Sequence, residues 1–193
     1  MSPKTPANKK GKPSRKGPSG FAIGMTAFMG VLTAGLVVLW FHTQPVEKGA
    51  FPSGTKSYDY VNGQHTVDAV TYTESPAVGG PHKPQWQACD AYQLPVDEML
   101  AVHSLEHGAV WLTYRPDLAA DRVAALEAYA MRSTYVLISP YPGQTEDVVA
   151  SAWNHQLRVA TYDAAVIEQF VEAMAQGPQT PEPGAPCREG GIR

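Results

Sequence analysis

The chain has 193 residues, with 15 Lys and Arg residues against 18 Asp and Glu residues. Six of the basic residues lie within residues 1–20, which hold no acid, so residues 21–193 have nine basic and 18 acidic residues and a net charge of −9. This balance excludes a uniformly basic nucleic-acid-binding domain, and it confines the basic block to a tail. The length allows one ordinary domain with extensions.

The N-terminal segments predict a membrane anchor. Residues 1–20 are mostly Pro, Gly, Ser and Lys, which predicts a disordered tail. Residues 21–41 carry no charge, and a helix of this length reaches about 31 Å, enough to cross a hydrocarbon core of about 30 Å. Because the basic tail lies on one side only, the positive-inside rule predicts a single-pass protein of the cell membrane. Its N-terminus would be cytoplasmic and its C-terminal domain extracytoplasmic.

A cleaved signal peptide is the competing interpretation of this segment. Signal peptides have a shorter apolar region, of roughly 7–15 residues, followed by a small-residue cleavage site. The uncharged stretch here is longer, and residues 40–49 offer no such site. The pattern therefore favours an uncleaved anchor.

The remaining residues predict one folded domain between two irregular segments. Residues 42–64 are a polar linker, residues 65–176 the extracytoplasmic domain, and residues 177–193 a Pro-rich tail. In chain order we expect a strand at 67–72, a long loop at 73–94, a helix opened by Pro95 and ended at Gly108, a strand at 109–114, a helix capped by Asp117 and ending near Met131, a strand at 135–139, paired strands at 148–153 and 156–161, and a helix from Asp163 to about Ala175. This order predicts an α+β fold, a compact mixed-sheet domain with helices packed on one face.

Two cysteines, Cys89 and Cys187, lie on the predicted outer side of the membrane. Thiols in an oxidising compartment usually pair, so we expect a disulfide that ties the Pro-rich tail back to the domain. The alternative is a pair of metal ligands or a redox pair. Neither cysteine belongs to a C-x-x-C motif, which favours the structural disulfide.

Residues 96–108 (VDEMLAVHSLEHG) carry the densest set of chemically active side chains. On a helix, His103, Glu106 and His107 fall within one arc of roughly 120°, which is also the apolar, core-directed stripe. Buried imidazoles need partners for their ring nitrogens, and two histidines one turn apart can face a single ion. Glu106 in the last turn meets the negative end of the helix dipole, so it needs a nearby cation or hydrogen-bond donor.

These three side chains also have a purely structural interpretation. His103 would be a core histidine with satisfied hydrogen bonds, and His107 would interact with the last carbonyls of the helix. Glu106 would pair with a surface arginine such as Arg115. The motif H-x-x-E-H, which His103, Glu106 and His107 complete, is in addition the inverted zinc-protease pattern, in which the glutamate activates a metal-bound water.

A third histidine, His82, follows Gly79-Gly80-Pro81, a sequence that allows a sharp turn and a close approach of the backbone. Together, His82, His103 and His107 would form a three-nitrogen site with an open position, as expected for zinc or copper. Met99, one turn before His103, would add a thioether that favours Cu(I), or would simply pack in the core. His65 and His155 are interpreted as surface or packing residues.

The motifs together resemble a known family. They are G-G-P-H at residues 79–82, V-H-S-L-E-H-G from Val102 to Gly108, S-P-Y-P-G, S-A-W and the terminal P-E-P-G-A-P-C. They resemble a domain-of-unknown-function family common in actinobacteria, whose members are small, with one N-terminal membrane span and an extracytoplasmic domain. The resemblance covers roughly residues 58–190. It implies that His82, His103, Glu106, His107 and the two cysteines are hallmark positions, but it implies no activity.

Three functional hypotheses follow. The first is a membrane-anchored domain that binds a transition-metal ion, copper or zinc, through His82, His103 and His107, with Glu106 orienting a ligand or holding a metal-bound water. The second is a non-enzymatic structural or interaction module of the cell envelope, with an envelope protein as partner and a buried His/Glu network that fixes the fold. The third is a metal-dependent hydrolase that uses H-x-x-E-H. The catalytic residues stay unknown, and an enzyme is the less favoured class.

Overall fold

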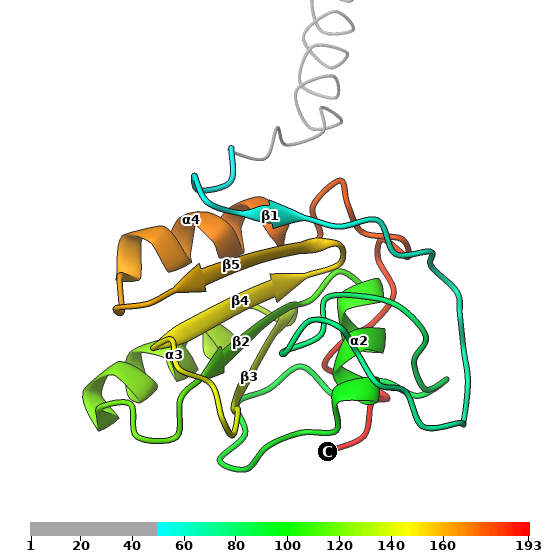
Figure 1. Ribbon diagram of the computed structural model, residues 1–193, viewed down its shortest axis with the longest axis horizontal. Coiled ribbons are helices and arrows are strands. Elements are labelled where there is room, and N and C mark those ends of the chain that lie inside the picture. The colour runs from blue at the N-terminus through cyan, green and yellow to red at the C-terminus, as the bar shows by residue number, and fades with distance from the viewer. Residues whose placement is uncertain (1–49) are drawn as a thin grey trace, which may run out of the picture. The chain divides into compact units, whose positions relative to one another are not determined.

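The computed structural model describes residues 50–193 (Figure 1). The predicted tail at 1–20, the predicted span at 21–41 and residues 42–49 of the predicted linker lie outside the described residues. Within residues 50–193, no helix has both the length and the apolar character needed to cross a membrane.

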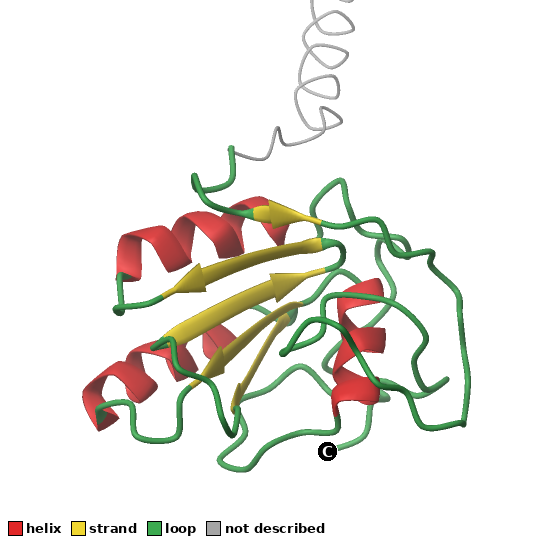
Figure 2. Cartoon of the chain, viewed as in Figure 1, coloured by secondary structure: helices red, strands yellow, loops and turns green. Residues whose placement is uncertain are grey.

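A five-stranded mixed sheet organises the described part of the chain (Figure 2). Its strands lie in the order β1-β5-β4-β2-β3; β2 and β3 run parallel, and the other neighbours run antiparallel. The elements, in chain order, are β1 (Lys56–Ser57), α2 (Glu98–Glu106), β2 (Val110–Tyr114), α3 (Ala120–Arg132), β3 (Val136–Pro140), β4 (Val148–Ala152), β5 (His155–Val159) and α4 (Ala164–Met174). The fold is therefore mixed α+β, as predicted.

The sheet is covered on both faces, which corrects the prediction that the helices pack on one face. Side chains of one face, such as Val110 and Leu112, belong to an apolar cluster with residues of α3 and α4. The intervening Trp111 belongs to a second cluster, in which Ala101 and Leu105 of α2 take part. Because alternate residues of a strand point to opposite faces, this division places α2 on the other side of the sheet from α3 and α4. Strands β2, β3 and β4 are buried along their whole length, which requires both layers.

Most of the remaining elements lie where the sequence predicts them. Asp163 caps α4 as predicted, through bonds from backbone N–H groups of the first turn. α2 begins at Glu98, three residues after the predicted opening at Pro95, because the Asp97 side chain accepts the Met99 N–H and caps the helix. Gly108 follows α2 with a φ of +90°, the left-handed conformation that ends a helix and favours glycine. The hairpin between β4 and β5 turns at Asn154, whose φ is +60°.

Three predictions about secondary structure are wrong. No strand forms at 67–72; Val67 is 85% exposed, so its side chain finds no core to pack against. Asp117 does not cap α3, because its carboxylate pairs with Arg115 at 3.1 Å, and the helix begins after Ala119 without a side-chain cap. β1 lies inside the segment predicted as a linker and pairs with β5 at the sheet edge.

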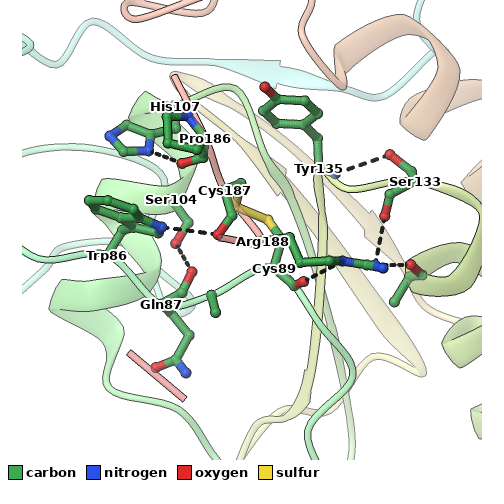
Figure 3. Close-up of a disulfide and its surroundings, with 12 residues drawn as sticks. Trp86, Gln87, Cys89, Ser104, His107, Ser133, Tyr135, Pro186, Cys187 and Arg188 are labelled. Atoms are coloured by element: carbon green, nitrogen blue, oxygen red, sulfur yellow. Dashed lines mark hydrogen bonds between the residues drawn. A yellow bond between two sulfur atoms is a disulfide. The ribbon is translucent and has the colours of Figure 1, made fainter. Parts of the chain in front are cut away.

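The C-terminal tail is tied back to the domain by the predicted disulfide. Cys89 and Cys187 are bonded, with their Cα atoms 5.2 Å apart (Figure 3). Backbone hydrogen bonds continue the attachment: the Ala88 N–H donates to the Ile192 carbonyl at 2.8 Å, and the Cys89 N–H donates to the Cys187 carbonyl at 3.1 Å. Figure 1 shows this tail, coloured red, running beside α2. The tail is therefore part of the structure that surrounds α2.

We predict that removing this disulfide destabilises the domain substantially. The bond joins residues 98 positions apart, so the double variant Cys89→Ser/Cys187→Ser should lose roughly 2–5 kcal/mol of unfolding free energy. Guanidinium denaturation of the full-length chain, followed by tryptophan fluorescence, measures the difference. The wild type in reductant is the matched control. An unchanged denaturation midpoint in both would contradict the prediction.

Candidate metal centre

The site is built around α2, which is buried from Leu100 to Glu106. Its first turn is fixed by the Asp97 cap, and its end is fixed by Gly108. A Cβ atom at Gly108 would lie 2.3 Å from the Gln176 side chain and 2.7 Å from that of Thr180, so the segment after α4 leaves no room for a larger residue there. The helical spacing then places His103, Glu106 and His107 in neighbouring positions one turn apart.

Three buried imidazoles are oriented in the same way, each by a main-chain carbonyl. The Nδ1 atoms of His82, His103 and His107 lie 2.8 Å, 2.7 Å and 2.7 Å from carbonyl oxygens. Those carbonyls belong to Gly80, Lys83 and Pro186 respectively. A carbonyl only accepts hydrogen bonds, so each Nδ1 carries the hydrogen, and the Nε2 atom of each neutral ring carries a lone pair. This is the arrangement by which proteins orient histidine ligands for a metal ion.

The first group of converging ligand atoms consists of His65, His82, His103 and Glu106, and we call it the Glu106 group. Its ligand atoms all lie within 4.8 Å of one another. The Glu106 Oε2 atom lies 2.9 Å from His82 Nε2 and 3.7 Å from His65 Nε2. The His65 ring stacks on the His103 ring, with centroids 4.8 Å apart. Three imidazoles thus surround one carboxylate oxygen.

Two atoms of the Glu106 group are buried without a hydrogen-bond partner among the described residues. They are His82 Nε2 and Glu106 Oε2, on side chains that are both 0% exposed. With the His82 Nδ1 hydrogen given to Gly80, a neutral His82 directs a lone pair at a carboxylate oxygen, and the two repel. Buried polar atoms of this kind are costly unless a proton or a cation lies between them. The pair therefore needs a positive charge.

The pKa shifts of His103 and Glu106 favour the protonation states that these side chains would need to bind a cation. Burial lowers the pKa of His103 to about 4, and the adjacent histidines lower it further, against the effect of the Lys83 carbonyl. Burial acts to raise the pKa of Glu106, but hydrogen bonds from the His82 side chain and the Gly63 N–H outweigh burial and lower it. The His82 contribution requires a proton on His82 Nε2 or a cation in its place. At neutral pH, His103 is thus a neutral donor and Glu106 an anion, the protonation states of metal ligands.

A second group, which we call the Glu182 group, consists of His103, His107 and Glu182. Its ligand atoms also lie within 4.8 Å of one another. The Glu182 Oε2 atom lies 3.4 Å from His107 Nε2, and the Glu182 side chain is 48% exposed. Trp86 packs against His107, with ring centroids 4.8 Å apart, and its indole N–H donates to the Cys187 carbonyl at 3.0 Å (Figure 3). The disulfide-bound tail therefore supplies one ligand of this group, Glu182, and its Cys187 carbonyl holds the Trp86 ring that packs against His107.

The structure divides the predicted ligand set between the two groups. His82 lies in the Glu106 group, His107 lies in the Glu182 group, and His103 belongs to both. Glu106 lies among the ligand atoms themselves. The backbone carbonyl of Met99 accepts from the Lys83 N–H at 3.3 Å, and its predicted thioether role stays a prediction.

Sequence reasoning did not assign two of the grouped residues. His65, interpreted as a surface or packing residue, has a side chain that is 42% exposed and yet lies against Glu106. Its isolated bridge to His82 is a contact over 17 positions that no local pattern reveals. Glu182 lies in the Pro-rich tail, where its only signal was the proximity of Cys187, five positions later.

The H-x-x-E-H motif places its residues differently from a hydrolytic centre. His103 and His107 do share a group with a carboxylate, Glu182, as a two-histidine, one-glutamate zinc site requires. However, Glu106 is enclosed by the Gly63 N–H and His82, and its pKa is lowered. A general base works best with a pKa raised toward the working pH. The geometry therefore suits binding better than hydrolysis.

Comparison with known proteins gives a family without a described activity. The family described as "Protein of unknown function (DUF3105)" matches residues 64–189. No curated protein matches the chain. No solved structure matches it either.

We predict that His103 remains neutral far below the ordinary pKa of histidine. In the metal-free chain its folded-state pKa is about 4, below the ordinary 6.5, so the unfolded state binds more protons between these values. The His103 contribution to stability is therefore complete above about pH 6.5 and is lost as the pH falls toward about 4. NMR titration of the imidazole nitrogens measures this directly. A His103 ring that protonates near pH 6.5, or that carries its hydrogen on Nε2, contradicts the arrangement.

Proposed function

The chain belongs to the DUF3105 family, and from the two groups on α2 we propose that it is a metal-binding domain that takes up one transition-metal ion. The single observation that supports this most strongly is the pair His82 Nε2 and Glu106 Oε2. Both atoms are buried, 2.9 Å apart, and without a hydrogen-bond partner among residues 50–193. A cation bound by both would remove the repulsion between them, and the oriented Nε2 of His103 would complete the binding site.

The donor set favours Zn²⁺, with Cu²⁺ as the second choice. Imidazole nitrogen and carboxylate oxygen are borderline to hard ligands, whereas Cu(I) prefers thiolate and thioether sulfur. Both cysteines are consumed in the disulfide, so no thiolate is available. Ligand atoms around tetrahedral zinc lie about 3.3 Å apart. The 2.9 Å and 3.7 Å separations at Glu106 Oε2 bracket that value, so binding requires only small movements.

We further propose that the domain acts outside the cell membrane, anchored by residues 21–41 with the N-terminus cytoplasmic. The uncharged segment and the one-sided basic tail support this placement. The disulfide supports it independently, because disulfides persist in oxidising compartments. The role would then be metal handling or support of an envelope process.

One observation also suits a second candidate, a structural or interaction module of the envelope. A protonated His82 would form a buried ion pair with Glu106 at the observed 2.9 Å, and the carbonyl bonds of the three imidazoles would complete a hydrogen-bond network. In that case the histidines would fix the fold and bind no metal. Metal content separates the two proposals.

We predict that the full-length chain, purified without added chelator, contains close to one equivalent of zinc or copper. The variant Glu106→Gln should weaken zinc binding by roughly 10–100-fold, because it removes the anion while keeping nearly the same shape. His155→Ala is the matched control, since His155 belongs to neither group and its Nδ1 lies 3.0 Å from the Trp153 carbonyl. Elemental mass spectrometry and competition with a colorimetric chelator measure content and affinity.

Two outcomes would overturn the metal proposal. The first is a folded chain that contains no metal and takes up neither Zn²⁺ nor Cu²⁺ on titration. The second is a Glu106→Gln variant that binds zinc as tightly as the wild type and the His155→Ala control. In the first case the envelope module becomes the better account, and its partner should be sought at the membrane.

A further inference from the structure

His103 belongs to both groups, and it has only one atom to offer. Its Nδ1 hydrogen is donated to the Lys83 carbonyl at 2.7 Å, so Nε2 is its sole lone pair. One imidazole nitrogen binds one metal ion at a time. We propose that the Glu106 group and the Glu182 group are alternative positions for a single ion, and that the ion passes between them while His103 stays bound. This inference rests on the proposed metal binding.

The two positions differ in their access to solvent. In the Glu106 group, His82 and Glu106 have side chains that are 0% exposed. In the Glu182 group, the carboxylate of Glu182 is 48% exposed while His107 is only 5% exposed. An exposed carboxylate attracts a hydrated cation over a distance, and a buried set of ligands then replaces its water. The Glu182 group is therefore the loading position, and the Glu106 group is the storage position.

His65 offers the other exposed approach, because its side chain is 42% exposed. An imidazole carries no negative charge in either protonation state, so it exerts no long-range attraction on a cation, and this ring stacks on His103 with an interplanar angle of 22°. His65 therefore covers the Glu106 group rather than collecting ions for it. The Glu182 carboxylate supplies the long-range attraction for a cation that the His65 side chain lacks.

The two positions are mechanically connected. The Glu182 N–H donates to the Glu106 carbonyl at 3.1 Å, so the segments that carry the two carboxylates are hydrogen-bonded to each other. The His103 and His107 rings lie 4.6 Å apart between centroids, at nearly right angles. The tail is fixed at Glu182 by this backbone bond and at Cys187 by the disulfide. An ion can thus exchange Glu182 and His107 for Glu106 and His82 without leaving His103.

A loading position has a specific kinetic signature. It opens a faster route to the storage position without changing the start or the end state. Losing it must therefore slow metal uptake and metal removal by the same factor, and it must leave the equilibrium affinity unchanged. A residue that merely binds the stored ion would instead weaken affinity when removed.

The first test is stoichiometry on the full-length chain, titrated with Zn²⁺. The wild type should saturate at one equivalent. His103→Ala should bind almost none, because it removes the shared ligand from both positions. Two equivalents in the wild type, or one tight equivalent remaining in His103→Ala, would overturn the proposal because the groups would then be independent sites.

The second test uses Glu182→Gln, which changes an exposed side chain and should not affect folding. We expect zinc affinity within about threefold of wild type, while uptake and removal by EDTA, followed by stopped flow, slow by roughly tenfold. Glu189→Gln, another exposed acid of the same tail, is the matched control and should behave as wild type. Unchanged rates in Glu182→Gln, or a tenfold loss of affinity with unchanged uptake, would overturn the loading role.

The outcomes distinguish this inference from the proposed function. If the wild type binds no metal, the proposed function fails and the exchange fails with it. If the wild type binds one equivalent but Glu182→Gln matches Glu189→Gln in every measurement, the proposed function stands and only the exchange is wrong.

Discussion

Hydrogen bonds between Nδ1 and main-chain carbonyls are the interaction on which the rest of this site depends. Each of three buried imidazoles gives its hydrogen to a carbonyl at 2.7–2.8 Å, and each therefore presents a lone pair on Nε2. Were the hydrogens on the other nitrogen, His82 would donate to Glu106, and the buried pair would be satisfied without a cation. Because each Nδ1 donates its hydrogen to a carbonyl, each Nε2 lone pair is free to bind a metal ion.

The carbonyls that do this come from segments without regular secondary structure. Gly80 and Lys83 lie in the long loop before α2, and Pro186 lies in the C-terminal tail. Loops of this kind hold a precise geometry only when they are buried or covalently restrained. Here Gly80 is buried, and the tail is fixed by the Cys89–Cys187 bond next to Pro186. The disulfide therefore stabilises the ligand geometry as well as the fold.

Local patterns predicted the parts of the molecule that depend on local physics. The helix carrying His103, Glu106 and His107 follows from its stop at Gly108 and from its spacing of three and four residues. The disulfide follows from the predicted compartment, and the α+β class follows from the order of elements.

Local sequence patterns could not predict contacts between segments that are distant in the chain. His65 reaches Glu106 across 41 positions, from a point just before residues 67–72, which predicted a strand but form none. Glu182 meets His107 only because the tail folds back, and nothing in the composition of a Pro-rich segment indicates where it docks. The prediction of helices on one face failed for a related reason, since α2 is buried on nearly all sides and has no single apolar face.

The most direct test of the account is X-ray absorption spectroscopy of the zinc-loaded, full-length chain. We predict only nitrogen and oxygen neighbours at about 2.0–2.1 Å, with the multiple-scattering signature of two or more imidazoles, and no sulfur. A sulfur neighbour at about 2.3 Å would instead assign the metal to a thioether or an opened disulfide. A spectrum of hydrated, weakly held zinc would show that the buried histidines and Glu106 are a structural network.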